Sequence, residues 1–97
     1  MDKPDFQETL DILSLSSARQ ILRTIIGEAK TIQEILEELE GKDFPIKYRA
    51  SVFKSLEKMV SAGLVKKIKQ DNSVKYRSRY SSVTADLIQE KLQLKRG

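Results

Sequence analysis

The sequence contains no cysteine and no histidine. Without cysteine the chain cannot form a disulfide, a zinc–thiolate site or a thiol redox sensor. Without histidine it lacks the commonest general base and metal ligand, which excludes nucleophile–histidine catalysis within this chain. No apolar run is long enough to span a bilayer, and the N-terminus lacks the features of a signal peptide. These absences predict a cytoplasmic protein that is not an enzyme and binds no metal or cofactor.

The 97 residues suffice for a single domain with a modest core, so we expect self-association to add stability. Charge is divided unevenly along the chain. Residues 1–46 carry five basic and ten acidic side chains, a balance of −5, whereas residues 47–97 carry thirteen and four, a balance of +9. We expect the basic half to be drawn to a polyanion and the acidic half to lie away from it. The alternative is that both halves are solvated surfaces without a partner.

Apolar spacing predicts two helices at the start of the chain. The first covers residues 5–14 and opens after Pro4, because proline suits the first turn of a helix. The second is expected to be capped by Ser16 or Ser17 and to end near Gly27. Both helices carry an apolar stripe, which predicts that both pack against the core.

A capping box predicts the start of a third helix. Thr31 is followed three residues later by Glu34, and each side chain can accept a hydrogen bond from the backbone of the other. The helix continues to Leu39 and is rich in glutamate on its outer side. Residues 41–46 are expected to form a turn, since the residue before Pro45 avoids the helical region.

Residues 47–62 are predicted to form a fourth, amphipathic helix, with Phe53 on the side that fills the core. At 100° per residue, the opposite side carries one hydroxyl and three amino groups: Lys47, Ser51, Lys54 and Lys58. Only one acid, Glu57, borders this stripe. Such a set of hydrogen-bond donors favours contact with nucleic acid. Solvent exposure alone is the alternative.

A basic hairpin is predicted over residues 64–80, after the helix stop Ala62-Gly63-Leu64-Val65. Two strands of alternating residues flank Asp71-Asn72-Ser73, a turn-forming triplet. Three cations are expected to share one face of the second strand: Lys75, Arg77 and Arg79. Those near the turn are expected to contact phosphates, whereas no contact is assigned to Arg79. The alternative is an edge strand that uses charge to avoid aggregation.

Residues 82–95 are predicted to form a C-terminal helix, introduced by capping hydroxyls. The apolar residues of this segment are Val83, Leu87, Ile88, Leu92 and Leu94. They form more apolar surface than docking of one terminal helix requires. Pairing with the first helix, or with a second copy of the chain, would bury it. Packing within the monomer is the alternative.

The order of helices, Ala-Gly-Leu-Val stop and basic hairpin resembles the winged helix-turn-helix transcriptional regulators. The similarity is to ArsR-like and MarR-like proteins and their archaeal relatives. It covers roughly residues 10–80 and rests on Leu13–Leu22, Ser51–Val65 and Val74–Arg77. The resemblance implies a mainly α fold with a small β-hairpin (α+β), a winged helix-turn-helix with extra N- and C-terminal helices. The whole chain, residues 1–97, would be one such domain.

The resemblance also implies roles. Thr31–Leu39 and Lys47–Ala62 would be the helix-turn-helix, with the second helix in the major groove of double-stranded DNA, and Lys66–Tyr80 would be the wing. Such proteins usually act as homodimeric repressors on pseudo-palindromic operators. Side chains expected at base edges are Lys47, Tyr48, Arg49, Ser51, Lys54 and Ser55. Side chains expected at phosphates are Lys58, Lys67, Lys69, Lys75 and Arg77. Side chains expected in the dimer interface are Phe6, Leu10, Leu87, Ile88, Leu92 and Leu94.

Other classes of function stay open beside this interpretation. The absence of cysteine excludes the thiol-based metal sensing of ArsR-type sensors. The domain could instead be a protein-interaction module of a larger transcription complex. RNA binding is less favoured, because the three tyrosines do not form a stacking platform: Tyr48, Tyr76 and Tyr80. The glutamates of the third helix could bind a hard cation, although such a cluster is far more often a solvated face: Glu34, Glu37, Glu38 and Glu40.

Overall fold

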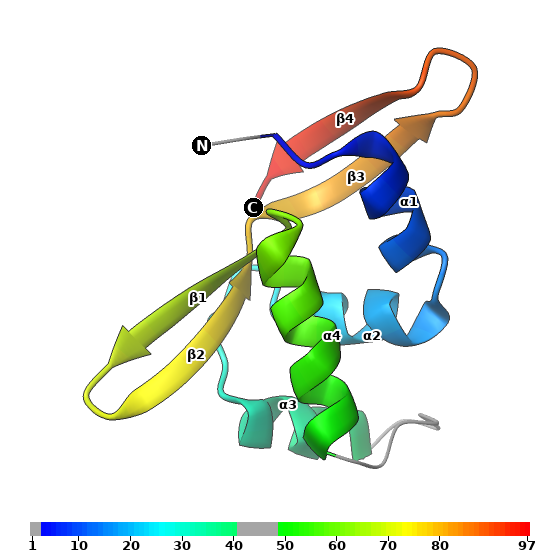
Figure 1. Cartoon of the computed structure of the whole chain (residues 1–97). Helices are drawn as coiled ribbons and strands as arrows, with labels where there is room; N and C mark the ends of the chain where they lie inside the picture. The colour runs from blue at the N-terminus through cyan, green and yellow to red at the C-terminus, as the bar shows by residue number, and fades with distance from the viewer. Residues whose placement is uncertain (1–2, 41–48) are drawn as a thin grey trace.

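The computed structural model describes residues 3–40 and 49–97. In these ranges the chain forms four helices and then two antiparallel β-hairpins (Figure 1). The helices are α1 (Phe6–Leu13), α2 (Ser16–Thr24), α3 (Ile32–Glu40) and α4 (Arg49–Ser61). The hairpins are β1 (Val65–Gln70) with β2 (Ser73–Ser78), and β3 (Tyr80–Asp86) with β4 (Lys91–Arg96). This α+β order agrees with the prediction as far as the end of β2.

Local hydrogen bonds explain where the first helices begin. Asp5 caps α1, because its carboxylate accepts a backbone hydrogen bond of 3.0 Å. The predicted capping box precedes α3: the Glu34 N–H donates to Thr31 Oγ1 at 3.2 Å, and the Thr31 N–H donates to Glu34 Oε1 at 2.9 Å. The serine cap expected for α2 is wrong. Leu15 holds the cap position without a side-chain hydrogen bond, and Ser16 already lies inside the helix.

One core unites the four helices and the first hairpin. Ile21 of α2, Ile35 of α3 and Leu56 of α4 have no exposed surface, and neither has Tyr76 of β2. The other buried members of this core are Ile12, Ala18, Ile25, Leu39, Val52, Met59, Ala62, Leu64 and Val65. Only one side of α4 contributes to this core, so its opposite side faces outward.

The first hairpin has a tight turn and a third backbone partner. Asp71 and Asn72 have φ angles of 48° and 64°, as a two-residue type I′ turn requires, and Ser73 already belongs to β2. On the far edge of β2, Tyr76 and Lys30 exchange two backbone hydrogen bonds of 2.8 and 2.9 Å. The segment that leads into α3 is therefore joined to the hairpin.

The C-terminal helix predicted over residues 82–95 is wrong, because this segment forms β3, a turn and β4. Val83 lies opposite Leu94, and Ala85 lies opposite Leu92. Apolar and polar residues thus alternate with a period of two on both strands, which is the pattern of a half-buried hairpin. Figure 1 shows the two strands side by side.

The turn of this second hairpin explains the error. Asp86 Oδ1 accepts hydrogen bonds of 3.1 Å from the backbone N–H groups of Ile88 and Gln89, and Glu90 takes a left-handed φ of 54°. A turn built on a carboxylate carries none of the glycine or proline that usually marks a loop. Its apolar residues, Leu87 and Ile88, lie in the turn and complete an apparent helical stripe without belonging to either strand.

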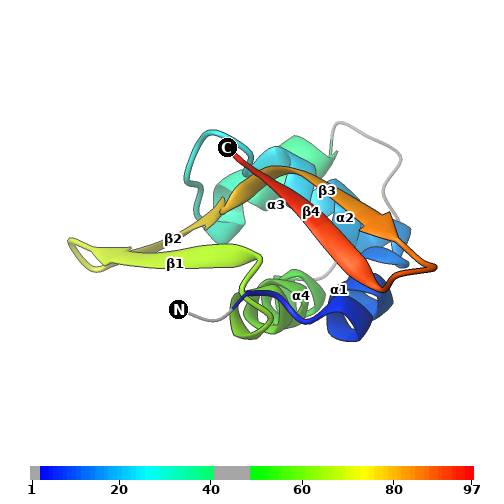
Figure 2. The same cartoon turned by 90° about the horizontal axis from the view of Figure 1, so that it is seen from above.

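The two hairpins project in different directions. Figures 1 and 2 show the β1–β2 hairpin extending beyond α4 on one side, while the β3–β4 hairpin passes α1 on the other. They are separate two-stranded sheets, although β3 follows β2 almost directly along the chain. None of the helices in residues 3–40 and 49–97 is long and apolar enough to cross a membrane.

Candidate nucleic-acid interface

The outward face of α4 carries free positive charge. Val52, Leu56 and Met59 are fully buried and fix the helix on the core. Lys54 and Lys58, one turn apart on the other side, are exposed. Within the described ranges, neither amino group forms an ion pair, since the two pairs that occur there involve other lysines. These lysines are available to an anionic partner.

Polar side chains border the two lysines. Ser51 and Ser55 are half-buried at one margin of the face. Arg49, in the first turn, is exposed, and its Nη1 donates a hydrogen bond of 3.1 Å to Gln33 Oε1 on α3. Arg49 thus links the two helices at the surface. The helix pair therefore presents donors along its exposed margin as well as charge.

Glu57, the one acid of α4, is held by the hairpin. Its Oε2 lies 3.0 Å from Lys67 Nζ on β1 and accepts a hydrogen bond of 2.8 Å from the Tyr76 hydroxyl on β2. These two contacts, chiefly that with Lys67, lower the pKa of Glu57. Burial, together with the bond to this carboxylate, raises the pKa of Tyr76 to about 12. At neutral pH a charged carboxylate therefore joins α4 to the hairpin through charge-assisted hydrogen bonds.

The hairpin cations lie on both of its faces. Lys67 lies opposite Tyr76, so Lys67 and its neighbour Lys69 share the face that contacts α4. The other face, turned from α4, carries Lys66, Lys75 and Arg77. Lys69 and Lys75 are the cations nearest the turn. The prediction omits Lys66, although strand alternation places it on the same face as two predicted cations.

Comparison of the sequence with known proteins finds no family for this chain. No protein-family model matches the chain, and no curated protein matches it. Among solved structures, an ArsR-like transcriptional regulator from Rhodococcus sp. RHA1 has a similar fold, with a TM-score of 0.58 and 20% sequence identity. The fold is a winged helix-turn-helix. The similarity covers 75% of this chain but 63% of that regulator, so the chain spans less than two thirds of its length.

In this fold α3 and α4 are the helix-turn-helix and the β1–β2 hairpin is the wing. The glutamates of α3 are largely engaged with near neighbours. Glu38 pairs with Lys30 at 3.0 Å, and Glu37 accepts a hydrogen bond of 3.2 Å from Gln33. The backbone and hydroxyl of Thr31 lower the pKa of Glu34, with smaller contributions from nearby lysines. In residues 3–40 and 49–97, no three acidic side chains gather in a group that could hold a metal ion.

Phe53 is the clearest departure from prediction on α4. It is 44% exposed and does not belong to the core. It lies one turn before Glu57, on the margin nearest the wing. Two predicted base contacts, Lys47 and Tyr48, lie outside the described residues, as does the whole of the predicted turn at 41–46.

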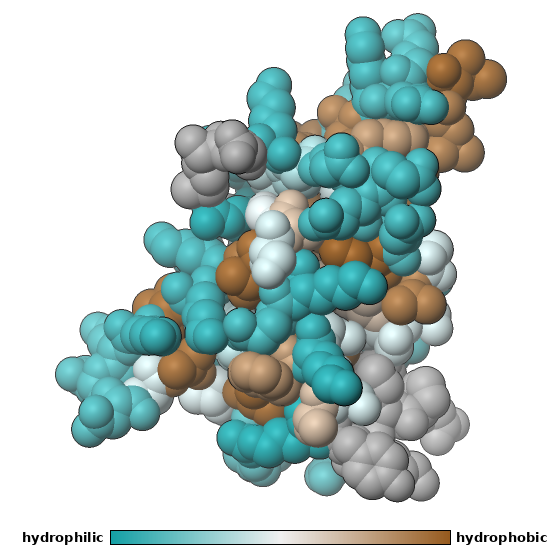
Figure 3. Space-filling view, viewed as in Figure 1, coloured by the Kyte–Doolittle hydropathy of each residue, from teal (hydrophilic) through white to brown (hydrophobic). Residues whose placement is uncertain are grey.

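The predicted dimer residues fall on two separate elements. Phe6 and Leu10 are half-buried on α1, and Leu92 and Leu94 are half-buried on β4. Two more lie in the turn of the second hairpin and are 67% and 93% exposed: Leu87 and Ile88. Figure 3 shows a hydrophobic patch at the tip of this hairpin, on a surface that is otherwise largely hydrophilic.

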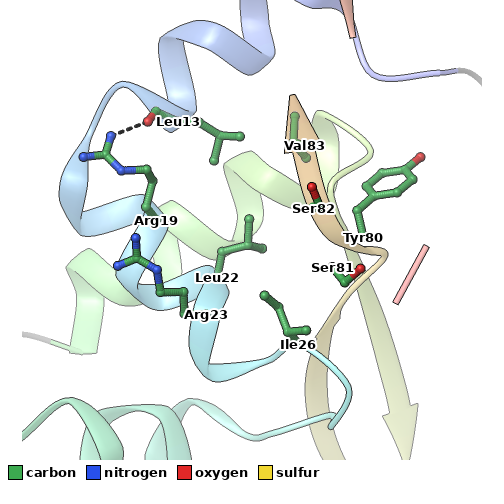
Figure 4. Close-up of a pocket in the computed structure, with 9 residues that line it drawn as sticks. All are labelled: Leu13, Arg19, Leu22, Arg23, Ile26, Tyr80, Ser81, Ser82 and Val83. Carbon is green, nitrogen blue, oxygen red and sulfur yellow. Dashed lines mark hydrogen bonds between the residues drawn. The ribbon is translucent and has the colours of Figure 1, made fainter. Parts of the chain in front are cut away.

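The base of the second hairpin rests on α2 across a small pocket of about 150 Å³. Leu13, Leu22 and Ile26 line it on the helical side, and Val83 of β3 faces them (Figure 4). The Arg19 guanidinium points away from this pocket and donates to the Leu13 carbonyl. The pocket is small and apolar, so it serves to seat Val83 rather than to bind a ligand.

Proposed function

We propose that this chain is a DNA-binding transcriptional regulator that reads a duplex with its recognition helix and holds flanking phosphates with its wing. The observation that carries the proposal is the exposed face of α4. Lys54 and Lys58 are free on it within the described ranges, while the acid of the same helix, Glu57, is turned to the wing and neutralised there. The fold shared with an ArsR-like regulator supports the same function.

The geometry divides the contacts into two kinds. Ser51, Lys54 and Ser55 lie together on the outward helix and are placed for base edges. Phe53, on the opposite margin near the wing, is a further candidate, since an exposed phenyl group can contact a thymine methyl group. Phosphate contacts are assigned to cations farther along the helix and near the wing turn: Lys58, Lys69 and Lys75. Lys67 holds Glu57 and contributes to position rather than to affinity.

Selection of duplexes from a random pool, followed by anisotropy titrations of the preferred site, tests the proposal. Lys54→Ala should lower discrimination between sites by about 1–3 kcal/mol, whereas Lys75→Ala should weaken all sequences alike and reduce the salt slope by about one. Arg23→Ala is the control, because Arg23 is an exposed cation on α2 and belongs neither to the proposed DNA surface nor to the second hairpin. If both variants behave like this control, the proposed DNA surface is wrong.

We further propose that the protein acts as a homodimeric repressor, with the second hairpin in the dimer interface. An isolated two-stranded hairpin is only marginally stable in water, and the helical core covers little more than its base. The tip exposes Leu87 and Ile88, and the strands leave backbone donors and acceptors unpaired along their edges. A second copy of the hairpin would cover these apolar side chains and pair the backbone groups of an edge strand. The predicted apolar residues are thus retained, on a hairpin instead of a helix.

Light scattering coupled to size exclusion tests the dimer. Ile88→Lys should shift the protein toward monomer and reduce the affinity for a two-fold symmetric duplex. Gln89→Lys is the control, because it adds the same charge one residue away in the same turn. A monomeric wild type, or a dimer unaffected by Ile88→Lys, would overturn this assignment.

The exposed Phe53 gives the interaction module some weight as a second candidate function. An aromatic side chain that is 44% exposed on a helix is a common anchor in protein–protein contacts. The duplex selection separates the two functions. Absence of any enriched sequence, together with a protein partner whose binding is lost in Phe53→Ala, would favour the module.

A further inference from the structure

A basic groove lies between the base of the wing and the end of the second hairpin. Its volume is about 630 Å³, within the range of small-molecule sites. Five cationic side chains line it and no acidic one does: Lys3, Lys66, Arg77, Arg79 and Arg96. These residues come from the N-terminal segment, both wing strands, the connection to β3, and β4. The fold thus collects charge that is widely separated in the sequence.

Arg79 marks the floor of this groove. Its Nε is buried and has no hydrogen-bond partner among the described residues. A buried donor without an acceptor is destabilising, and a guanidinium group binds phosphate and carboxylate oxygens in a bidentate geometry. An adjoining depression shares Lys3 and Arg79 and carries the acids Asp5 and Glu8. Asp5 is already engaged in capping α1, and neither acid forms an ion pair with Arg79.

The groove differs from the proposed DNA surface in the residues that line it, although Lys75, a proposed phosphate contact, shares the wing face of Lys66 and Arg77. Lys66 and Arg77 lie opposite each other on the wing face that is turned from α4, whereas Lys67 and Tyr76, on the other face, contact Glu57 of α4. The walls of the groove come from both hairpins and from the N-terminal segment. Apolar surface is also present, from Tyr80 and Leu94.

We propose that this groove binds a small molecule with two or more phosphate groups. Arg79 and Arg96 hold the phosphates, Lys66 and Arg77 complete the charge, and Tyr80 offers a surface for an attached ring. The ligand relieves the mutual repulsion of the five cations and binds the guanidinium group of the half-buried Arg79. The inference does not depend on DNA binding, because it rests chiefly on Arg79 and Arg96, which are not among the proposed DNA contacts.

Calorimetry with inorganic triphosphate, at constant ionic strength, tests the proposal on the full chain. One ion should bind per chain, and at about tenfold excess over Kd it should raise Tm by about 5 °C or more. A nucleoside triphosphate should bind more tightly if the wall formed by Tyr80 and Leu94 contributes. Equal binding of the two would mean that phosphate alone is recognised. Sulfate at the same ionic strength should produce no comparable rise.

Arg96→Gln and Arg79→Gln should each weaken triphosphate binding on the order of tenfold, equivalent to the loss of one charge-assisted contact. Lys95→Gln is the matched control, because Lys95 precedes Arg96 on β4 but does not line the groove. Arg96 is exposed, so its variant should fold even if that of the half-buried Arg79 does not.

Three results would overturn the proposal: no triphosphate binding beyond that of sulfate, equal losses in Arg96→Gln and Lys95→Gln, or several weakly bound ions per chain. A fourth concerns DNA. If Arg96→Gln lowers duplex affinity and its salt slope as Lys54→Ala does, the groove belongs to the DNA surface. Triphosphate binding in a chain that binds no DNA would leave this inference standing and remove only the proposed function.

Discussion

Replacement of Tyr76 by phenylalanine tests whether α4 and the wing are joined through Glu57. The ring of Tyr76 is fully buried in the core, and the substitution preserves it while deleting the hydroxyl that donates to Glu57 at 2.8 Å. A hydrogen bond to a charged group contributes about 1.5–3 kcal/mol. The Glu57 side chain is 34% exposed, so water and Lys67 partly replace the lost donor. We therefore expect a loss of about 1 kcal/mol in the free energy of unfolding, and a fall in Tm of about 4–8 °C.

Urea and thermal unfolding of the wild type, Tyr76→Phe, Glu57→Gln and the double variant give the coupling directly. The urea midpoint should fall without a change in the m-value, because the buried surface is unchanged. The double-mutant cycle should yield a coupling energy of about 0.5–1.5 kcal/mol between the two side chains. A coupling energy of zero would refute the assigned network. Duplex affinity measured on the same variants shows whether loosening the wing also weakens DNA binding.

The pH dependence follows from the same pair. The pKa of Glu57 is lower in the folded chain than its ordinary value of 4.5, so the stabilisation is complete above that value and is lost as pH falls through the folded pKa. The pKa of Tyr76 is raised from 10.0 to about 12, so its contribution is complete below 10.0 and is lost between 10.0 and about 12. The difference in the free energy of unfolding between wild type and Tyr76→Phe should therefore decrease at both low and high pH. A constant difference across pH would contradict the reasoning.

Three further predictions concern stability and are measured by urea unfolding. Thr31→Ala removes the cap of α3 and should cost about 1 kcal/mol, whereas Thr31→Ser should retain most of it. Leu56→Ala, at a fully buried site of α4, should cost about 2–5 kcal/mol, and a smaller loss would mean that the surrounding core collapses into the space. Glu90→Gly should raise stability by up to about 1 kcal/mol, because Glu90 holds a left-handed φ of 54° that glycine adopts without steric strain; faster amide exchange in β3 and β4 would count against this.

Local signals in the sequence predict the parts of the fold that depend on neighbours. Thr31 and Glu34 are three residues apart, and the side chain of each accepts a hydrogen bond from the backbone N–H of the other. This short-range pattern alone specifies the start of α3. Asp71 and Asn72 tolerate a left-handed φ, so the wing turn can also be predicted from the sequence. The second hairpin is not predicted. The apolar turn residue Ile88 extends the spacing typical of a helix, and the strand alternation on either side of it is only a few residues long.

The candidate sites depend on contacts between residues that are far apart in the sequence. Only part of each site can therefore be predicted from the sequence. The positive stripe on α4 follows from helical spacing, and the structure leaves Lys54 and Lys58 exposed. The neutralisation of Glu57 needs the wing folded against the helix, which no spacing within α4 reveals. The basic groove likewise joins Lys3 to Arg96 and appears only when both ends of the chain meet the wing.

The residue at the centre of the wing has a consequence for how the protein would meet a duplex. Tyr76 forms two backbone hydrogen bonds with Lys30, and its ring packs in the core. Its hydroxyl donates a hydrogen bond to Glu57. Backbone, ring and hydroxyl thus give Tyr76 three independent contacts, which leave the hairpin little freedom to swing. If the chain binds DNA as proposed, the distance between the helix that would enter one groove and the hairpin that would meet the next is set during folding. Less conformational entropy is then lost on association.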